Sequence, residues 1–151
     1  MIKLLYAALG TLGFGMIFNA NKNKLIYIML GGLLGYLGYY VTDLFMNNIF
    51  IASSVCAIVT STYSFIMARV LKCPSTIFIL PGLIPIVPGG SLFYAMRDLV
   101  LGDSNDALNQ AIITIEVIFG IVAGMLFVST INVIRKEIFK TKLKRWNKWK
   151  K

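Results

Sequence analysis

The hydrophobic and polar positions of this chain form long apolar segments that are separated by short polar loops. A helix needs about 20 apolar residues to cross a bilayer, so segments of this kind predict membrane-spanning helices. We predict five of them, over residues 4–18, 25–42, 49–68, 75–100 and 107–134. The sequence therefore predicts an all-α integral membrane protein, with a transmembrane domain over residues 1–134 and a basic tail over residues 135–151.

Small residues mark the faces on which three of these helices are expected to pack. They are Gly31 and Gly35 in the second span, Gly120 and Gly124 in the last span, and Ala52, Cys56, Thr60, Ser64 and Ala68 at every fourth position of the third span. Small side chains let helix backbones approach closely in a membrane. We expect each of these faces to contact protein and not lipid.

The amino-acid composition supports a membrane protein and indicates which kinds of partner it binds. Of the 151 residues, 58% are apolar and 14% are charged, and the mean hydropathy is +0.78, which is far from the profile of a soluble domain. The net charge of +9 is concentrated at the C-terminal end and in short loops. This distribution fits anionic lipid better than nucleic acid, so we expect anionic lipid at the basic tail and no nucleic-acid partner.

The residue types present exclude several kinds of chemistry. The sequence has no histidine, which removes histidine-based triads, the usual zinc sites and the usual proton shuttle. Its two cysteines, Cys56 in an apolar span and Cys73 beside a loop proline, do not indicate a disulfide scaffold. Ser91 has no histidine to activate it, and Asp103 and Asp106 match no catalytic pattern. We expect no enzyme, no cofactor and no metal site.

Lysine and arginine residues in short loops stay on the cytoplasmic side of a membrane. With five alternating spans, all of the 15 basic residues except Lys3 and Arg97 fall on one side. We therefore predict a multi-pass protein of the plasma membrane, with the N terminus outside and the C terminus in the cytoplasm. The alternative for the first segment, residues 4–18, is a signal peptide with Lys3 as its charged start.

Three prolines and three glycines interrupt the fourth predicted span, within residues 81–91. Proline blocks a helical hydrogen bond and glycine adds conformational freedom, so we predict a discontinuous helix. Non-helical backbone at membrane depth persists only where protein or a water-filled cavity satisfies its polar groups, which makes this break a candidate site. A kink that serves only packing is the alternative interpretation.

The chemistry predicted around the break suits a zwitterion. Ser91 is a candidate N-cap for a helix over residues 92–101, whose first N–H groups would attract a carboxylate. Pro85 and Pro88 have no N–H group, so the carbonyl groups that would bond to them in a helix could instead accept a hydrogen bond from an ammonium group. Arg97 either assists an anion or anchors the helix at the outer interface. The candidate substrate-binding residues of the break are Pro85, Pro88, Gly89, Gly90, Ser91 and Arg97.

Glu116 is the only acidic residue well inside a predicted span. Ionisable residues at that depth usually face a cavity and take part in transport. We predict that it shares a helix face with Asn109, Gly120 and Ala123. An apolar setting favours its protonated form, so Glu116 is a candidate proton carrier, and a glutamate that joins helices by hydrogen bonds is the alternative.

The basic tail has apolar residues at helical spacing, namely Phe139, Leu143 and Trp146, with Trp149 one turn beyond. This pattern predicts a basic amphipathic helix in the inner headgroup region, where tryptophan is favoured. The alternative is a solvated tail that only fixes the topology.

Three segments carry a resemblance to a known family. They are Gly13-Phe14-Gly15-Met16-Ile17-Phe18-Asn19, the glycine-rich second span, and Ile84-Pro85-Ile86-Val87-Pro88-Gly89 followed by Tyr94-Ala95-Met96. These segments resemble the short-subunit branch of the threonine/serine exporter family, over residues 13–124. The matching positions are Asn19, Pro85, Pro88 and Gly89, which the resemblance implies are substrate-site residues. Arg97 and Glu116 are not part of the family's pattern.

The resemblance implies a five-span protein similar to the C-terminal half of a longer exporter, working with a separately encoded larger membrane subunit. We therefore expect a subunit of a two-component secondary exporter, which moves threonine, serine or another small amino acid or short carboxylate out of the cell. The alternative is a non-transporting assembly or scaffold subunit. A homo-oligomer is also compatible with the sequence.

Overall fold

The computed structural model of this chain describes the backbone of residues 2–149 and the side chains of residues 2–138. Over these residues the chain forms six α-helices, one short 3-10 helix and no strand. In chain order the elements are α1 (Ile2–Ile17), α2 (Lys22–Met46), α3 (Ile49–Val70), α4 (Thr76–Leu83), η1 (Ile84–Ile86), α5 (Gly89–Leu101) and α6 (Ser104–Trp149). The all-α prediction is confirmed.

Three of the described helices, α2, α3 and α6, are long and apolar enough to cross a membrane. The pair formed by α4 with η1 and by α5 provides a fourth candidate span, bent by 48° at its break. Helix α1 is apolar but has only 16 residues, or about 24 Å, against a hydrocarbon core of about 30 Å. The structure therefore supports a multi-pass membrane protein with three or four spans, and the predicted fifth span depends on α1.

Glycines on two faces of α2 bring α1 and α3 close to it. Gly32 lies against Thr11 of α1, and Gly35 lies against Thr60 of α3, so that a Cβ atom on either glycine would collide with a threonine side chain. A Cβ atom on Gly31 would lie 2.9 Å from the ring of Tyr63. The predicted close approach of a neighbouring helix along Gly31 and Gly35 is confirmed.

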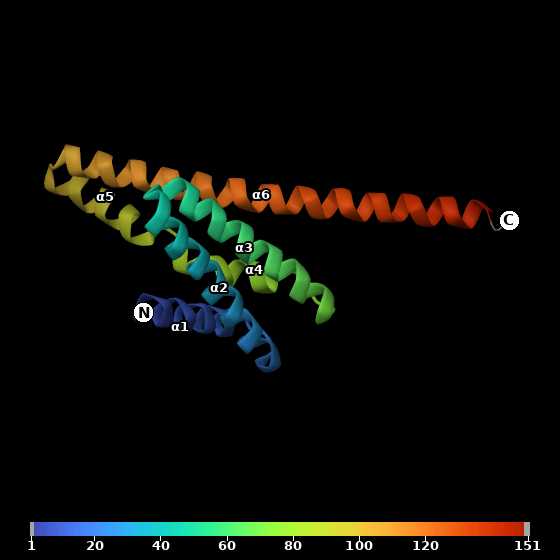
Figure 1. Cartoon of the computed structure of the whole chain (residues 1–151). Coiled ribbons are helices and arrows are strands. Elements are labelled where there is room, and N and C mark those ends of the chain that lie inside the picture. Colours follow the sequence, from blue (N-terminus) through green and yellow to red (C-terminus); the bar gives the residue numbers. More distant parts are fainter. Residues whose placement is uncertain (1, 150–151) are drawn as a thin grey trace.

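Helices α3 and α6 run in the same direction and touch along their small residues (Figure 1). A Cβ atom on Gly120 would lie 2.9 Å from Cβ of Ser53, and one on Gly124 would lie 2.8 Å from Cβ of Ala57. The predicted small face of α3 is buried at Ala52, Cys56, Thr60 and Ser64, which are at most 1% exposed, and Ala68 at its end is partly exposed. Both faces therefore contact protein, as predicted.

The two halves of the bent pair have different neighbours. Helix α4 packs against α1, α2 and α3, whereas α5 packs against α6 as an antiparallel pair (Figure 1). The break therefore lies where the chain leaves the group formed by α1 to α4 and joins the α5–α6 pair.

Helix α6 is 46 residues long, about 69 Å, and extends well beyond the other helices toward the C terminus (Figure 1). The chain stays helical across residue 134, so the predicted border between membrane domain and tail does not coincide with a helix end. The side chains of Phe139, Leu143, Trp146 and Trp149, which carry the predicted amphipathic pattern, lie outside the described side chains.

Candidate functional site

The fourth span is discontinuous between Leu83 and Gly89, as the sequence predicts. Helix α4 ends at Leu83, one 3-10 turn contains Pro85, and α5 begins at Gly89 after Pro88, whose ψ of 51° is not helical. The first proline of the segment, Pro81, lies inside α4 and does not end it. Pro85 and Pro88 therefore form the irregular backbone.

The break faces the helix bundle. Phe78, Pro81 and Leu83 are buried just before it, and Ile86 is buried within it. Ile86 also packs in a cluster with Cys56 of α3 and Val117 of α6. A discontinuous segment in this position has protein on one side at membrane depth, which is the setting in which such backbone is stable.

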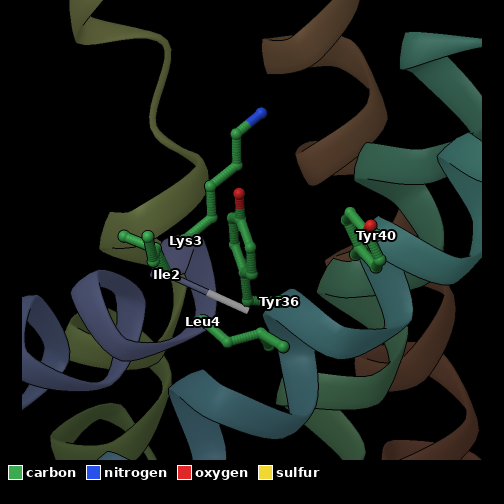
Figure 2. Close-up of a pocket in the computed structure, with 5 residues that line it drawn as sticks. All are labelled: Ile2, Lys3, Leu4, Tyr36 and Tyr40. Atoms are coloured by element: carbon green, nitrogen blue, oxygen red, sulfur yellow. The ribbon is translucent and has the colours of Figure 1, made fainter.

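Two adjoining cavities lie beside the break and share Lys3 and Tyr36. The first, of about 260 Å³, lies between α1, α2 and η1 and is lined by Lys3, Tyr6, Ala7, Gly10, Tyr36, Ile84 and Pro85. The second, of about 360 Å³, is lined by Ile2, Lys3, Leu4, Tyr36 and Tyr40 (Figure 2). Together they form an open pocket in which apolar walls surround a few polar groups.

The polar groups of this pocket are an ammonium group and phenol hydroxyls. Figure 2 shows the side chain of Lys3 beside that of Tyr36, with both polar ends pointing the same way. The Tyr36 ring stacks on the Tyr39 ring at a centroid distance of 6.0 Å, which holds it in place. Lys3 forms no ion pair with an acidic side chain among the described residues. An unpaired ammonium group beside hydroxyl donors can bind a carboxylate.

The prediction that Ser91 caps α5 is wrong. The helix begins two residues earlier at Gly89, with Pro88 at the N-cap position and no side-chain cap. Ser91 lies within the first turn, where its Oγ donates to the carbonyl of Pro88 (3.1 Å) and accepts from Oγ1 of Thr114 on α6 (3.0 Å). Ser91 thus ties the start of α5 to α6.

Gly89 and Gly90 are exposed at the start of α5, and a Cβ atom on either would meet nothing within 4 Å. Neither has a positive φ, since Gly102 is the only glycine of the described residues with one. Packing and backbone conformation within this chain therefore do not require glycine at these two positions.

Three other predicted residues lie away from the pocket lining. Arg97 pairs with Asp98, with Nε and Nη2 at 2.7 and 2.6 Å from Oδ1, and its guanidinium lies 4.8 Å from the centre of the Tyr94 ring. Asn19 is exposed in the turn between α1 and α2, with a φ of 53°, at the opposite end of α1 from Lys3. Glu116 is exposed on α6.

The face predicted for Glu116 is partly wrong. Asn109 and Ala123 are exposed like Glu116, but Gly120 is buried against α3. Of the candidate substrate-binding residues, only Pro85 lines the pocket, while Pro88 and the two glycines follow directly along the break.

Sequence reasoning missed Lys3, Tyr6, Tyr36 and Tyr40 as pocket residues. Two signals were present. Lys3 is one of only two basic residues on the predicted outer side, and Tyr36 and Tyr40 are four residues apart, which places both hydroxyls on one helix face.

A multi-pass helical protein with a broken helix beside a pocket of this kind has the architecture of a secondary transporter. The comparison with family models agrees with this class. A family described as Threonine/Serine exporter, ThrE, matches residues 3–131, which is most of the chain. The chain therefore belongs to the threonine/serine exporter family, a family of transporters and not of enzymes. No solved structure matches the chain significantly.

Proposed function

We propose that this chain is one subunit of a two-component secondary exporter, which moves threonine, serine or another small amino acid or short carboxylate out of the cell. In this proposal α1 is a fifth span, and the chain lies in the plasma membrane with its N terminus outside and its C terminus in the cytoplasm. Family membership supports the transport class, and the loop charges support the orientation.

The pocket beside the break is the observation that carries the proposal. Lys3 offers a positive charge to a substrate carboxylate, and Tyr36 offers a hydroxyl group next to it. On the other side of the same pocket, Ile84 and Pro85 bring the irregular backbone of η1 to the lining, where its carbonyl groups can accept from a substrate ammonium group. A substrate with both charges would then lie across α1 and η1.

A larger partner subunit is part of the proposal because the pocket is open and five spans are few for a complete carrier. Secondary transporters usually enclose their site between two repeats or halves. In this chain α5 packs mainly against α6, and its other side exposes Leu92, Phe93 and Met96. A second subunit could cover this apolar surface and close the site.

We also propose that export is coupled to the proton gradient. Glu116 was the predicted proton carrier, and it lies outside the pocket on the exposed side of α6. A coupling role for Glu116 would therefore act where this chain meets another subunit.

Export from peptide-loaded cells tests the proposal. Cells that express this chain, the larger subunit, both or neither are loaded with a threonine- or serine-containing dipeptide, and the amino acid is followed inside and outside. We expect rapid efflux only in cells that express both proteins. Equal accumulation in all four strains would contradict the proposal, and efflux with this chain alone would contradict its two-component form.

A further inference from the structure

Glu116 is a carboxyl group on the outside of a membrane helix. It lies twelve residues after Ser104, about 18 Å along α6, which is near the middle of a hydrocarbon core of about 30 Å. The contact between Thr114 and Ser91 places this part of α6 beside the break. Glu116 is nevertheless exposed and has no hydrogen-bond or ion-pair partner among the described residues. An ionisable group at this depth is costly against lipid.

The residues around Glu116 form a regular seam along α6. Asn109, Glu116, Ala123 and Thr130 recur every seven residues, and all four are exposed. Three positions after each lies a large apolar residue that is also more than half exposed, in the order Ile112, Phe119, Leu126 and Val133. A seven-residue repeat with this offset is the pattern by which one helix packs along another. We call these eight residues the α6 seam.

The composition of the α6 seam is unusual for a lipid contact. It alternates polar or small residues with large apolar ones, and Asn109, Glu116 and Thr130 all bear hydrogen-bonding side chains. Polar side chains in a membrane are usually directed at another helix, where they find hydrogen-bond partners. Beside the seam, the exposed residues Ile118 and Val122 are both apolar.

The chemistry of the seam also indicates which helix covers it. Two copies of this chain, related by a two-fold axis along the membrane normal, would bring Glu116 against Glu116 at the same depth. The described lysine and arginine side chains lie near the helix ends or in turns, except Arg135 and Lys136, which lie about 28 Å or more beyond Glu116 along α6, so a second copy offers no basic residue at that depth. A different chain with a donor there would complement the carboxyl group.

We propose that the α6 seam is the surface on which the larger subunit docks, through a helix that presents a lysine, arginine, asparagine or glutamine side chain to Glu116 at the middle of the membrane. This inference rests on the proposed two-component function. It states which surface of this chain contacts the larger subunit. Asn109 and Thr130 then fix the register of the two helices, and the four large apolar residues pack between them.

Site-specific crosslinking in membranes that contain both subunits tests the assignment. A benzophenone amino acid replaces Phe119 in the seam or, as the matched control, Ile118, which is also exposed but points about 100° away around the helix. We expect the larger subunit to crosslink at position 119 at least fivefold more strongly than at position 118. A crosslink from position 119 to a second copy of this chain would overturn the assignment.

Variants of the carboxyl group provide the second measurement. We expect Glu116→Ala to lower the amount of larger subunit that co-purifies with this chain at least threefold, while Glu116→Gln, which keeps hydrogen-bonding capacity, lowers it less, and Ile118→Ala leaves it unchanged. Normal co-purification of Glu116→Ala together with no crosslink at position 119 would overturn the inference and leave the two-component proposal standing. Absence of any co-purification or partner-dependent export would instead remove the two-component proposal itself.

Discussion

Lys3 is the basic residue of the pocket, and we expect Lys3→Ala to raise the substrate concentration for half-maximal export about tenfold. The reason is the loss of a charge-assisted hydrogen bond to the substrate carboxylate, worth about 1.5–3 kcal/mol. Lys3→Arg should restore much of the affinity, because it keeps the charge. Initial rates in membrane vesicles at several substrate concentrations measure the effect. The matched control is Lys22→Ala at the first residue of α2, and an equal effect of both alanine variants would contradict the assignment.

Gly32 lets α1 pack closely against α2. We expect Gly32→Ala to destabilise the protein by about 1–3 kcal/mol, because the new methyl group collides with Thr11 of α1. Gly13→Ala is the control, because a Cβ atom there meets nothing within 4 Å. Thermal unfolding in detergent compares the two variants. A Gly32→Ala variant as stable as Gly13→Ala would show that α1 can move away from α2 at little cost.

Single residues of the site were only partly predictable. Pro85 was found because proline changes backbone hydrogen bonding locally, whatever its neighbours are. Lys3 and Tyr36 were missed because they are far apart in sequence and meet only through the packing of α1 on α2. Ser91 was placed at a cap because its hydroxyl could serve there, but the helix starts earlier and the hydroxyl bonds to Pro88 and Thr114.

Variants at the start of α5 can show whether the break takes part in transport or serves only helix packing. We expect the double variant Gly89→Ala, Gly90→Ala to fold and to assemble normally, because both positions are open and have no positive φ. If substrate approaches the N–H groups at this helix start, the added methyl groups should lower export at least fivefold. Export per assembled complex is the measurement, with Gly13→Ala as the control. Altered assembly with unchanged export per complex would favour the scaffold alternative.

The helices themselves were largely predictable from the sequence, and their ends were less so. Apolar segments long enough to cross a membrane have little alternative to a helix, because their backbone groups must bond within the segment. The change from apolar to basic residues near residue 134 looked like a border, but lysine and arginine favour helix nearly as well as leucine does. Helix α6 therefore continues through the change.

For the whole molecule, the two native cysteines test the orientation in the membrane. Cys73 is partly exposed in the turn before α4, and Cys56 is 1% exposed inside the bundle, and neither is in a disulfide. We expect Cys73 of intact cells to react with a membrane-permeant maleimide and not with an impermeant one, while Cys56 reacts with neither. Asn105→Cys, in the exposed first turn of α6, is the control that should react with both reagents. Labelling of Cys73 by the impermeant reagent would show that Cys73 lies outside the cell and that the proposed topology is wrong.

The arrangement of helices was the part that the sequence left open. Small residues indicated which faces would be buried, but a small face does not specify its partner. Helix α3 meets α2 at Gly35 through Thr60 and α6 at Gly124 through Ala57, and these two glycines are 89 positions apart in the chain. Such pairings depend on the shapes of several helices at once.

The parallel course of α3 and α6 has a topological consequence for the chain between them. If both helices cross the membrane, α6 must begin on the side where α3 began, which is opposite to the side where α3 ends. The intervening residues 71–103 must therefore pass from one side of the membrane to the other. A re-entrant hairpin at the break would return the chain to its starting side and would make α6 antiparallel to α3. If α3 and α6 both cross, the bent pair is therefore a single interrupted crossing.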